Sequence, residues 1–134
     1  MALQKSDGGS TPFNQQIVAS LMRSNKMGLH IVEVSQHIKA YRDAMIDALA
    51  KALPGAMVRK PEGGYFLWVE LPEGMSGDAL AARSIVHGVE VSSGRVCFPT
   101  AAAENYLCLA YSFVGLDTIR DGIRRLGIAY KELL

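Results

Sequence analysis

Residues Pro61–Gly74, PEGGYFLWVELPEG, decide the fold that this sequence predicts. The adjacent glycines Gly63 and Gly64 predict a tight turn, because glycine adopts positive φ without a steric penalty. The apolar and aromatic run Tyr65–Leu71 is typical of a strand. The short segment Met57–Arg59 lies before the turn, so the two segments together predict a β-hairpin.

Four further elements are expected after the hairpin. They are a helix that Ser76 or Asp78 caps and that ends at His87-Gly88, strands over Val89–Ser92 and Tyr106–Ser112, and a last helix that opens at Asp117. Alternation along a strand places Cys108 on the opposite face from Leu107 and Leu109. Apolar residues recur in the last helix at steps of four, three and four, which predicts one buried face: Ile119, Ile123, Leu126 and Tyr130.

The chain before the hairpin is mainly helical. Apolar residues at steps of three and four predict a helix from about Ile31 to about Leu53, which Pro54-Gly55 ends. Thr11-Pro12 is a typical start for a shorter, earlier helix, since threonine caps and proline suits the first helical position. Residues 1–10 are rich in glycine and serine and are expected to be loose.

The fold class that these elements predict is α+β, an α/β two-layer arrangement. A long N-terminal helix precedes a small mixed sheet of three or four short strands, with helices on one face of the sheet. The expected domain organisation has residues 1–30 as a leader plus a helix that belongs to another, larger domain. Residues 31–134 are expected to form one domain that includes the long helix.

Composition excludes several classes of function. The 134 residues are 49% hydrophobic and 20% charged, which is typical of one globular domain with a modest core. The net charge of +1 provides no attraction toward nucleic acid or an anionic membrane. No apolar run approaches the roughly 20 residues of a membrane-spanning helix. No secretory leader precedes the two cysteines, so we expect a reduced, cytoplasmic protein without disulfides.

Candidate metal-binding and catalytic groups are few. His30, Glu33 and His37 could share one helix face as metal ligands. No fourth ligand stands at an obvious spacing, and a solvated face is the favoured interpretation, so we predict no metal site. The six lysines occur in segments that predict exposed side chains, whereas a nucleophilic lysine must be desolvated or lie beside another cation. We therefore predict no catalytic residue on this chain.

Three segments in this order resemble the C-terminal part of a class I/II aminotransferase, an enzyme of fold type I that uses pyridoxal phosphate (PLP). They are Pro61–Gly74, Ser93-Gly94-Arg95 ahead of Phe98, and Asn105–Ser112, NYLCLAYS. The resemblance covers nearly the whole chain, because residues 10–22 resemble the last helix of the family's large domain and residues 30–54 resemble its long interdomain helix. Within the family, the branch that acts on 2-aminoadipate, kynurenine and aromatic or branched-chain amino acids is favoured.

The resemblance implies substrate-binding positions. In the family, an arginine in a pattern like N-x-L-R-L binds the substrate's α-carboxylate, and Cys108 occupies that position here. A thiol cannot offer two parallel N–H donors to a carboxylate. Loss of the arginine's bidentate contact costs on the order of 2–4 kcal/mol, which lowers an equilibrium constant or a rate roughly 30- to 1000-fold. Arg95 is a hypothetical replacement. Ser93 is a second departure, where the family often has proline. The predicted substrate-binding residues are therefore Gly64, Tyr65, Arg95 and Cys108.

The resemblance also implies how the chain works. PLP, and the lysine that binds it, would belong to the large domain of a full-length parent. No lysine here lies in the family's Ser-x-x-Lys setting, so we expect no cofactor on this chain and no transamination by it alone. It would be a truncated gene product or a fragment, paired as a homodimer or with the missing large domain. The alternatives are a non-catalytic amino-acid-binding or regulatory module and a structural assembly module.

Overall fold

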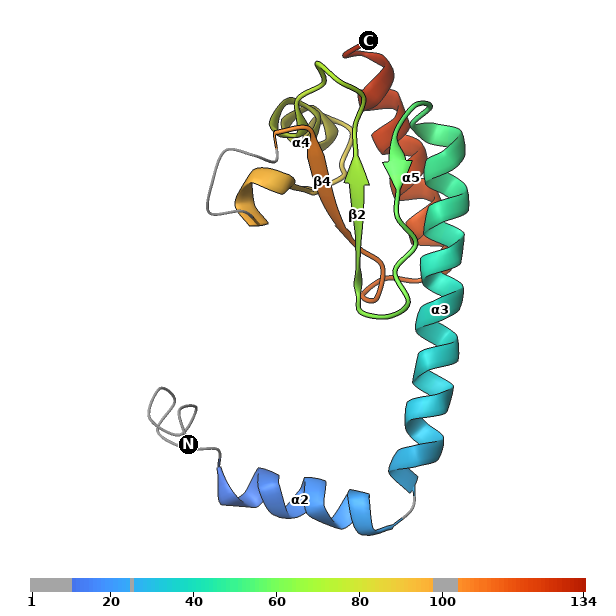
Figure 1. Ribbon diagram of the computed structural model, residues 1–134, viewed down its shortest axis with the longest axis vertical. Coiled ribbons are helices and arrows are strands. Elements are labelled where there is room, and N and C mark those ends of the chain that lie inside the picture. The colour runs from blue at the N-terminus through green and yellow to red at the C-terminus, as the bar shows by residue number, and fades with distance from the viewer. Residues whose placement is uncertain (1–10, 25, 98–103) are drawn as a thin grey trace. The chain divides into compact units, whose positions relative to one another are not determined.

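The computed structural model describes residues 11–24, 26–97 and 104–134 (Figure 1). Its elements in chain order are α2 (Pro12–Arg23), α3 (Lys26–Ala52), β1 (Met57–Val58), β2 (Phe66–Glu70), α4 (Gly77–Val86), β3 (Ser92–Ser93), the short 3₁₀ helix η1 (Gly94–Cys97), β4 (Tyr106–Ala110) and α5 (Leu116–Lys131). The predicted loose leader, residues 1–10, lies outside the described residues. No described helix combines the length and the apolar character that crossing a membrane requires.

The chain divides into two compact units, residues 1–37 and 38–134. The first contains α2, which begins at Pro12 as predicted, although the Thr11 side chain makes no capping hydrogen bond. The start of α3 at Lys26 lies earlier than the expected Ile31, because Gly28 continues the helix rather than breaking it. The predicted domain boundary between residues 30 and 31 stays a prediction.

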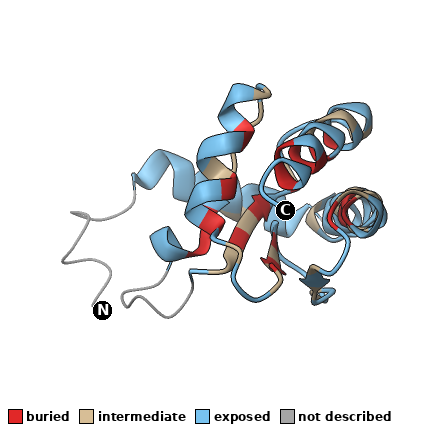
Figure 2. Ribbon diagram, turned by 90° about the horizontal axis from the view of Figure 1, so that it is seen from above, coloured by how far each residue is buried: buried red, intermediate tan, exposed pale blue. Residues whose placement is uncertain are grey.

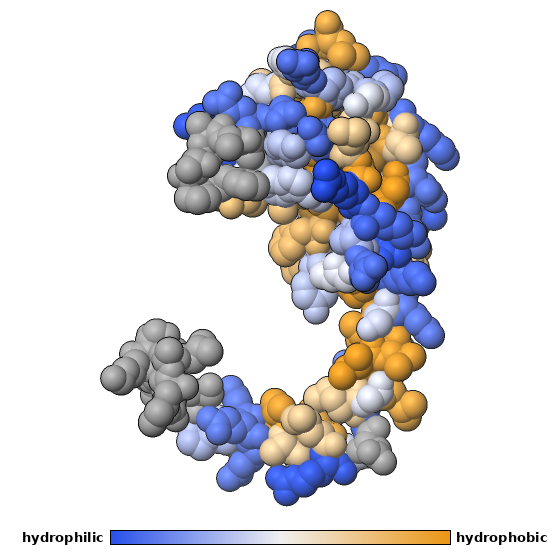
Figure 3. All heavy atoms as spheres, in the orientation of Figure 1, coloured by the Kyte–Doolittle hydropathy of each residue, from blue (hydrophilic) through white to orange (hydrophobic). Residues whose placement is uncertain are grey.

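Apolar side chains of the first unit lie largely in the open. No residue of α2 is buried, and Figure 3 shows hydrophobic residues over α2 and the first turns of α3. The exposed large apolar residues of this unit are Phe13, Ile17, Val18, Leu21, Met22, Leu29, Ile31, Val32 and Val34. Such a contiguous set is unusual on a monomer and is typical of a surface that another polypeptide covers.

The second unit contains a four-stranded sheet in the order β1-β2-β4-β3. The α+β class and the predicted hairpin of β1 and β2 are confirmed. The expectation of a mixed sheet is wrong, because all three pairings are antiparallel. β2 and β3 run in the same direction, but β4 lies between them, so no parallel pair forms. β3 is also displaced from the expected Val89–Ser92 to Ser92–Ser93.

Register determines which face of the sheet is buried. Leu67 pairs with Leu109 and Val69 with Leu107, and all four side chains are buried. Helices α3, α4 and α5 cover this face, as predicted, and Figure 2 shows buried residues on these helices. The predicted buried face of α5 is confirmed, since its four apolar residues at steps of four, three and four all belong to the core.

Candidate functional site

The loop between β1 and β2 is held at its end by a buried tyrosine. Gly64 has φ of 91°, which confirms the predicted glycine-dependent turn. The Tyr111 hydroxyl donates a hydrogen bond to the Gly64 carbonyl at 2.8 Å. The Tyr111 amide donates to the Tyr65 carbonyl at 3.0 Å. Burial raises the pKa of Tyr111, so its hydroxyl stays a protonated donor at neutral pH.

The start of the same loop is held by an arginine from α3. Arg42 is 5% exposed, and its Nη1 donates to the Pro61 carbonyl at 2.7 Å. Its Nε donates to Asp43 Oδ1 at 2.8 Å, and Lys60 Nζ lies 2.9 Å from the same oxygen. Hydrogen bonds from Arg42, first, and from Lys60 lower the pKa of Asp43 to about 2. Both ends of the loop that carries Gly64 and its neighbours are therefore fixed.

We expect the stability contribution of Asp43 to disappear in acid. Its pKa in the folded state lies below the unfolded value of 3.8. A depressed pKa contributes stability above the unfolded pKa, and the contribution is lost as pH falls from about 4 to about 2. The urea midpoints of the wild type and of Asp43→Asn should therefore differ near pH 6 and converge toward pH 2.

The matched control for this pH experiment is Asp47→Asn, which makes the same chemical change one turn further along α3. It shows what loss of a helix carboxylate does where that carboxylate lacks the contacts that Asp43 makes with Arg42 and Lys60. A difference between wild type and Asp43→Asn that stays constant from pH 6 to pH 2 would contradict the expectation.

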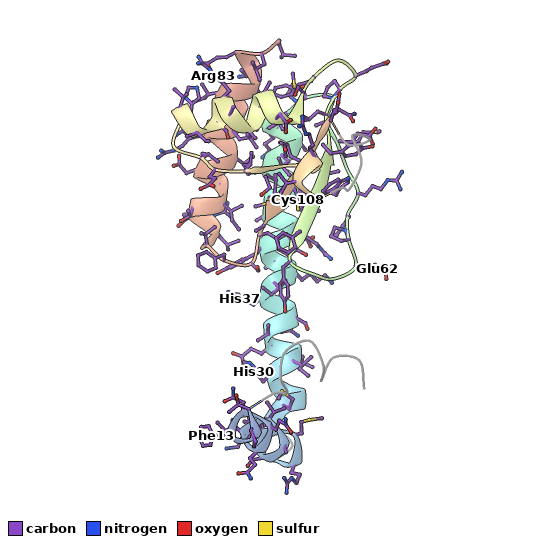
Figure 4. All side chains as sticks on the ribbon, turned by 90° about the vertical axis from the view of Figure 1, so that its left-hand side faces the viewer. Phe13, His30, His37, Glu62, Arg83 and Cys108 are labelled. Carbon is purple, nitrogen blue, oxygen red and sulfur yellow. The ribbon has the colours of Figure 1, made fainter. Side chains whose placement is uncertain are left out.

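The face of the sheet away from the helices carries an aromatic cluster around Cys108. Cys108 pairs in register with Trp68 on β2 and with Ser92 on β3, and Figure 4 shows it in the middle of the sheet. Trp68 stacks on Tyr106 with ring centroids 5.5 Å apart, and Phe66 is 59% exposed on the same face. The alternation in FLWVE is the signal that could have placed Trp68 and Phe66 together on one face of the sheet; Trp68 pairs with Cys108 and Phe66 with Ala110.

The Cys108 thiol is neutral at physiological pH. Burial, first, and then the neighbouring Cys97 raise the pKa of Cys108 to about 11. The apolar residues around Cys97 in the sequence are typical of a strand and predict that Cys97 is buried; this prediction is wrong, because Cys97 lies at the end of η1 and is exposed. The physical reason is that β3 stops after two residues and the chain turns into the 3₁₀ helix.

The four predicted substrate-binding residues do not form one cluster. Gly64 and Tyr65 lie at the end of the sheet, where both bond to Tyr111. Tyr111 follows Cys108 by three residues, which corresponds to about 10 Å along an extended chain. Arg95 is 65% exposed on η1, and its Nη1 lies 3.3 Å from Asp78 Oδ2 of α4. Its guanidinium is thus paired with a carboxylate of its own chain. The substrate-binding roles stay predictions.

The described lysines lie at the surface. All five are exposed, and Lys60 is paired with Asp43, whereas a lysine that binds PLP covalently must be desolvated or lie beside another cation. His30 and His37 occupy separate turns of α3 (Figure 4). In residues 11–24, 26–97 and 104–134, no group of three or more His, Cys, Asp or Glu side chains could hold a metal ion.

Comparison with known proteins identifies the family. The model of the family described as aminotransferase class I and II matches residues 3–110. The chain belongs to the class I and II aminotransferases. It is 32% identical over 133 residues to aromatic-amino-acid aminotransferase 1 of Thermococcus litoralis, an alignment that covers 98% of this chain and 32% of that enzyme. The resemblance inferred from the sequence is thereby confirmed.

The aminotransferase fold is also shared with solved structures. The kynurenine aminotransferase of Pyrococcus horikoshii, in complex with PMP, superposes with a TM-score of 0.90 and 34% identity over 99% of this chain and 33% of its own. An uncharacterised HTH-type transcriptional regulator of Bacillus subtilis, YdfD, is 28% identical over 130 residues, covering 96% of this chain and 27% of the regulator. The chain spans about a third of the length of the curated relatives it matches.

Proposed function

We propose that this chain is the C-terminal small-domain portion of a PLP-dependent aminotransferase. In the full-length protein it would close over an amino acid or 2-oxo acid during amino-group transfer. The observation that carries the proposal is the continuous match, at 34% identity and a TM-score of 0.90, to one third of an aminotransferase. The favoured substrates are aromatic amino acids, kynurenine and 2-aminoadipate, because relatives named for them align over nearly the whole chain.

In a full-length parent, the catalytic lysine and the cofactor would belong to the large domain. When bound, PLP supplies an electron sink for the substrate's α-carbon. This chain's own contribution is to position the substrate. The loop of Gly64 and Tyr65, fixed by Arg42 and Tyr111, would border the bound substrate, and the neutral thiol of Cys108 would face its carboxylate.

The partner is a large domain or a second copy of this chain. The exposed apolar residues of α2 and the first turns of α3 favour association. Neither a nucleic acid nor a membrane is proposed as a partner, and the compartment is the cytoplasm. The chain alone is expected to show no transamination.

A second candidate is a regulatory module that binds an amino acid without turning it over. Two observations favour it: the match to an HTH-type transcriptional regulator over 96% of this chain, and the replacement of the expected arginine by Cys108. In this alternative, substrate binding survives and the chemistry is lost. A purely structural module would retain neither property.

A domain exchange tests these functions. The matching C-terminal third of the Thermococcus litoralis aminotransferase is replaced by this chain, and amino-group transfer from an aromatic amino acid is measured. Measurable turnover, reduced relative to the parent enzyme, is expected for a catalytic small domain. A folded chimera that binds the amino acid but does not turn it over would favour the regulatory module.

The 134-residue chain alone is the second arm of that experiment. It is mixed with PLP and an amino acid, treated with borohydride and examined by mass spectrometry. No turnover is expected, and any PLP adducts should be spread at low level over several lysines rather than concentrated on one, because the described lysines are exposed. An adduct on one lysine together with turnover would overturn the proposal.

A further inference from the structure

Two cysteines far apart in the sequence meet at the open face of the sheet. Ser92 of β3 pairs with Cys108 of β4. The chain leaves β3 through η1, which packs on β4 and ends at Cys97. There the Cys97 thiol lies close enough to that of Cys108 to help raise the pKa of Cys108. Both cysteines are free thiols. Strand pairing and the short helix thus place two reducing groups side by side.

The two thiols differ in access to solvent. Cys97 is exposed, whereas Cys108 is partly buried between neighbouring strands. A reagent from solution therefore reaches Cys97 first, and Cys108 lies behind it as a second thiol. This arrangement of one accessible and one adjacent, shielded cysteine is typical of an attacking and a resolving pair.

We propose that Cys97 and Cys108 form a redox-active dithiol that a low-molecular-weight disulfide, such as oxidised glutathione, converts into an intramolecular disulfide. The Cys97 thiolate attacks one sulfur of glutathione disulfide, forms a mixed disulfide and releases one glutathione thiolate. Cys108 loses its proton to solvent and attacks the Cys97 sulfur, which releases the second glutathione. Two protein thiols are oxidised while one glutathione disulfide is reduced to two thiols.

The reaction joins two elements that already pack on each other, η1 and β4. The sulfurs must come to about 2 Å from each other, and rotation of the exposed Cys97 side chain contributes to this movement. The new bond ties η1 to β4 and removes the Cys108 thiol from the open face. The dithiol does not depend on the proposed aminotransferase function, because it rests on the position of two thiols alone.

The test uses the full 134-residue chain with oxidised glutathione and three proteins: wild type, Cys97→Ser and Cys108→Ser. Mass spectrometry should show that the wild type loses two hydrogen atoms and retains no glutathione. Cys108→Ser should retain one glutathione on Cys97. Cys97→Ser should react at least tenfold more slowly than the wild type, because the shielded thiol is left alone. Oxidation of the wild type should raise its thermal midpoint by about 5–10 °C.

Three results would overturn the proposal. They are a wild type that keeps glutathione as long as Cys108→Ser does, a Cys97→Ser variant that reacts as fast as the wild type, and a wild type that does not react. If circular dichroism shows that a variant is unfolded, the test rests on the wild type alone. Its proteolytic digest must then contain a disulfide-linked pair of peptides with Cys97 and Cys108, and their absence after oxidation refutes the dithiol.

Discussion

Gly77→Ala is expected to lower the free energy of unfolding by about 3 kcal/mol. Gly77 is the first residue of α4 and is buried. A Cβ added there would lie 2.3 Å from the carbonyl oxygen of Tyr106 and 3.1 Å from that of Glu104. Both oxygens belong to the backbone, so no side-chain rotation relieves the clash, and either α4 or the start of β4 must move.

The same movement breaks a hydrogen bond. The Gly77 amide donates to the Glu104 carbonyl at 2.7 Å, and Ser76 caps α4 by accepting from Ala79. Displacing α4 therefore loses a buried backbone bond as well as packing. Because β4 carries Cys108, the substitution should also disturb the open face of the sheet.

Urea denaturation of the wild type and two variants measures the effect. The matched control is Gly122→Ala, also a helical glycine, where an added Cβ would meet nothing within 4 Å. This control should be more stable by about 0.5–1 kcal/mol, since alanine favours the helix. Equal stability of Gly77→Ala and the wild type would show that the two carbonyls can move away at no cost.

The buried face of the fold could be predicted because local periodicity reports it. Alternation in β2 places Leu67 and Val69 toward the core, and the four-three-four spacing identifies the buried face of α5. β3 could not be placed this way. Serines 92 and 93 have low strand propensity and pair because β4 lies beside them. α3 begins at Lys26 rather than at the expected Ile31, because the helix continues through Gly28 and an isolated glycine costs a helix only about 1 kcal/mol.

The candidate site could be predicted only where the backbone conformation of a position requires a particular residue type, such as glycine. Gly64 met that condition, because its turn needs positive φ. The contacts that hold the loop join residues separated by 19 and 47 positions, Arg42 to Pro61 and Tyr111 to Gly64. No local pattern reports such contacts, and the same is true of the meeting of Cys97 with Cys108.

Cys108→Arg is expected to raise kcat/KM for an amino acid substrate by roughly 30- to 1000-fold, measured in the chimera with the Thermococcus litoralis large domain. A guanidinium offers two parallel N–H donors to a carboxylate, whereas a neutral thiol offers at most one weak donor. The gain corresponds to about 2–4 kcal/mol of recovered binding in the transition state. The position tolerates a long side chain at the open face, where Phe66 and Ala110 are both exposed.

Two controls separate carboxylate binding from a general effect of the new charge. Cys108→Lys adds a cation without a planar fork and should recover only part of the gain. An amine substrate without an α-carboxylate should not benefit from Cys108→Arg, because it has no group for the fork to bind. Equal gains for both substrates would mean that position 108 does not face the carboxylate.

The alternative assignment of the carboxylate to Arg95 makes the opposite prediction in the same chimera. If Arg95 binds the substrate, Arg95→Ala should lower kcat/KM of the unmodified chimera by the same 30- to 1000-fold that one lost bidentate contact costs, and Cys108→Arg should add little. The pairing of Arg95 with Asp78 argues against this role, since the guanidinium would have to leave an existing ion pair. A large gain from Cys108→Arg with no loss from Arg95→Ala assigns the carboxylate position to residue 108.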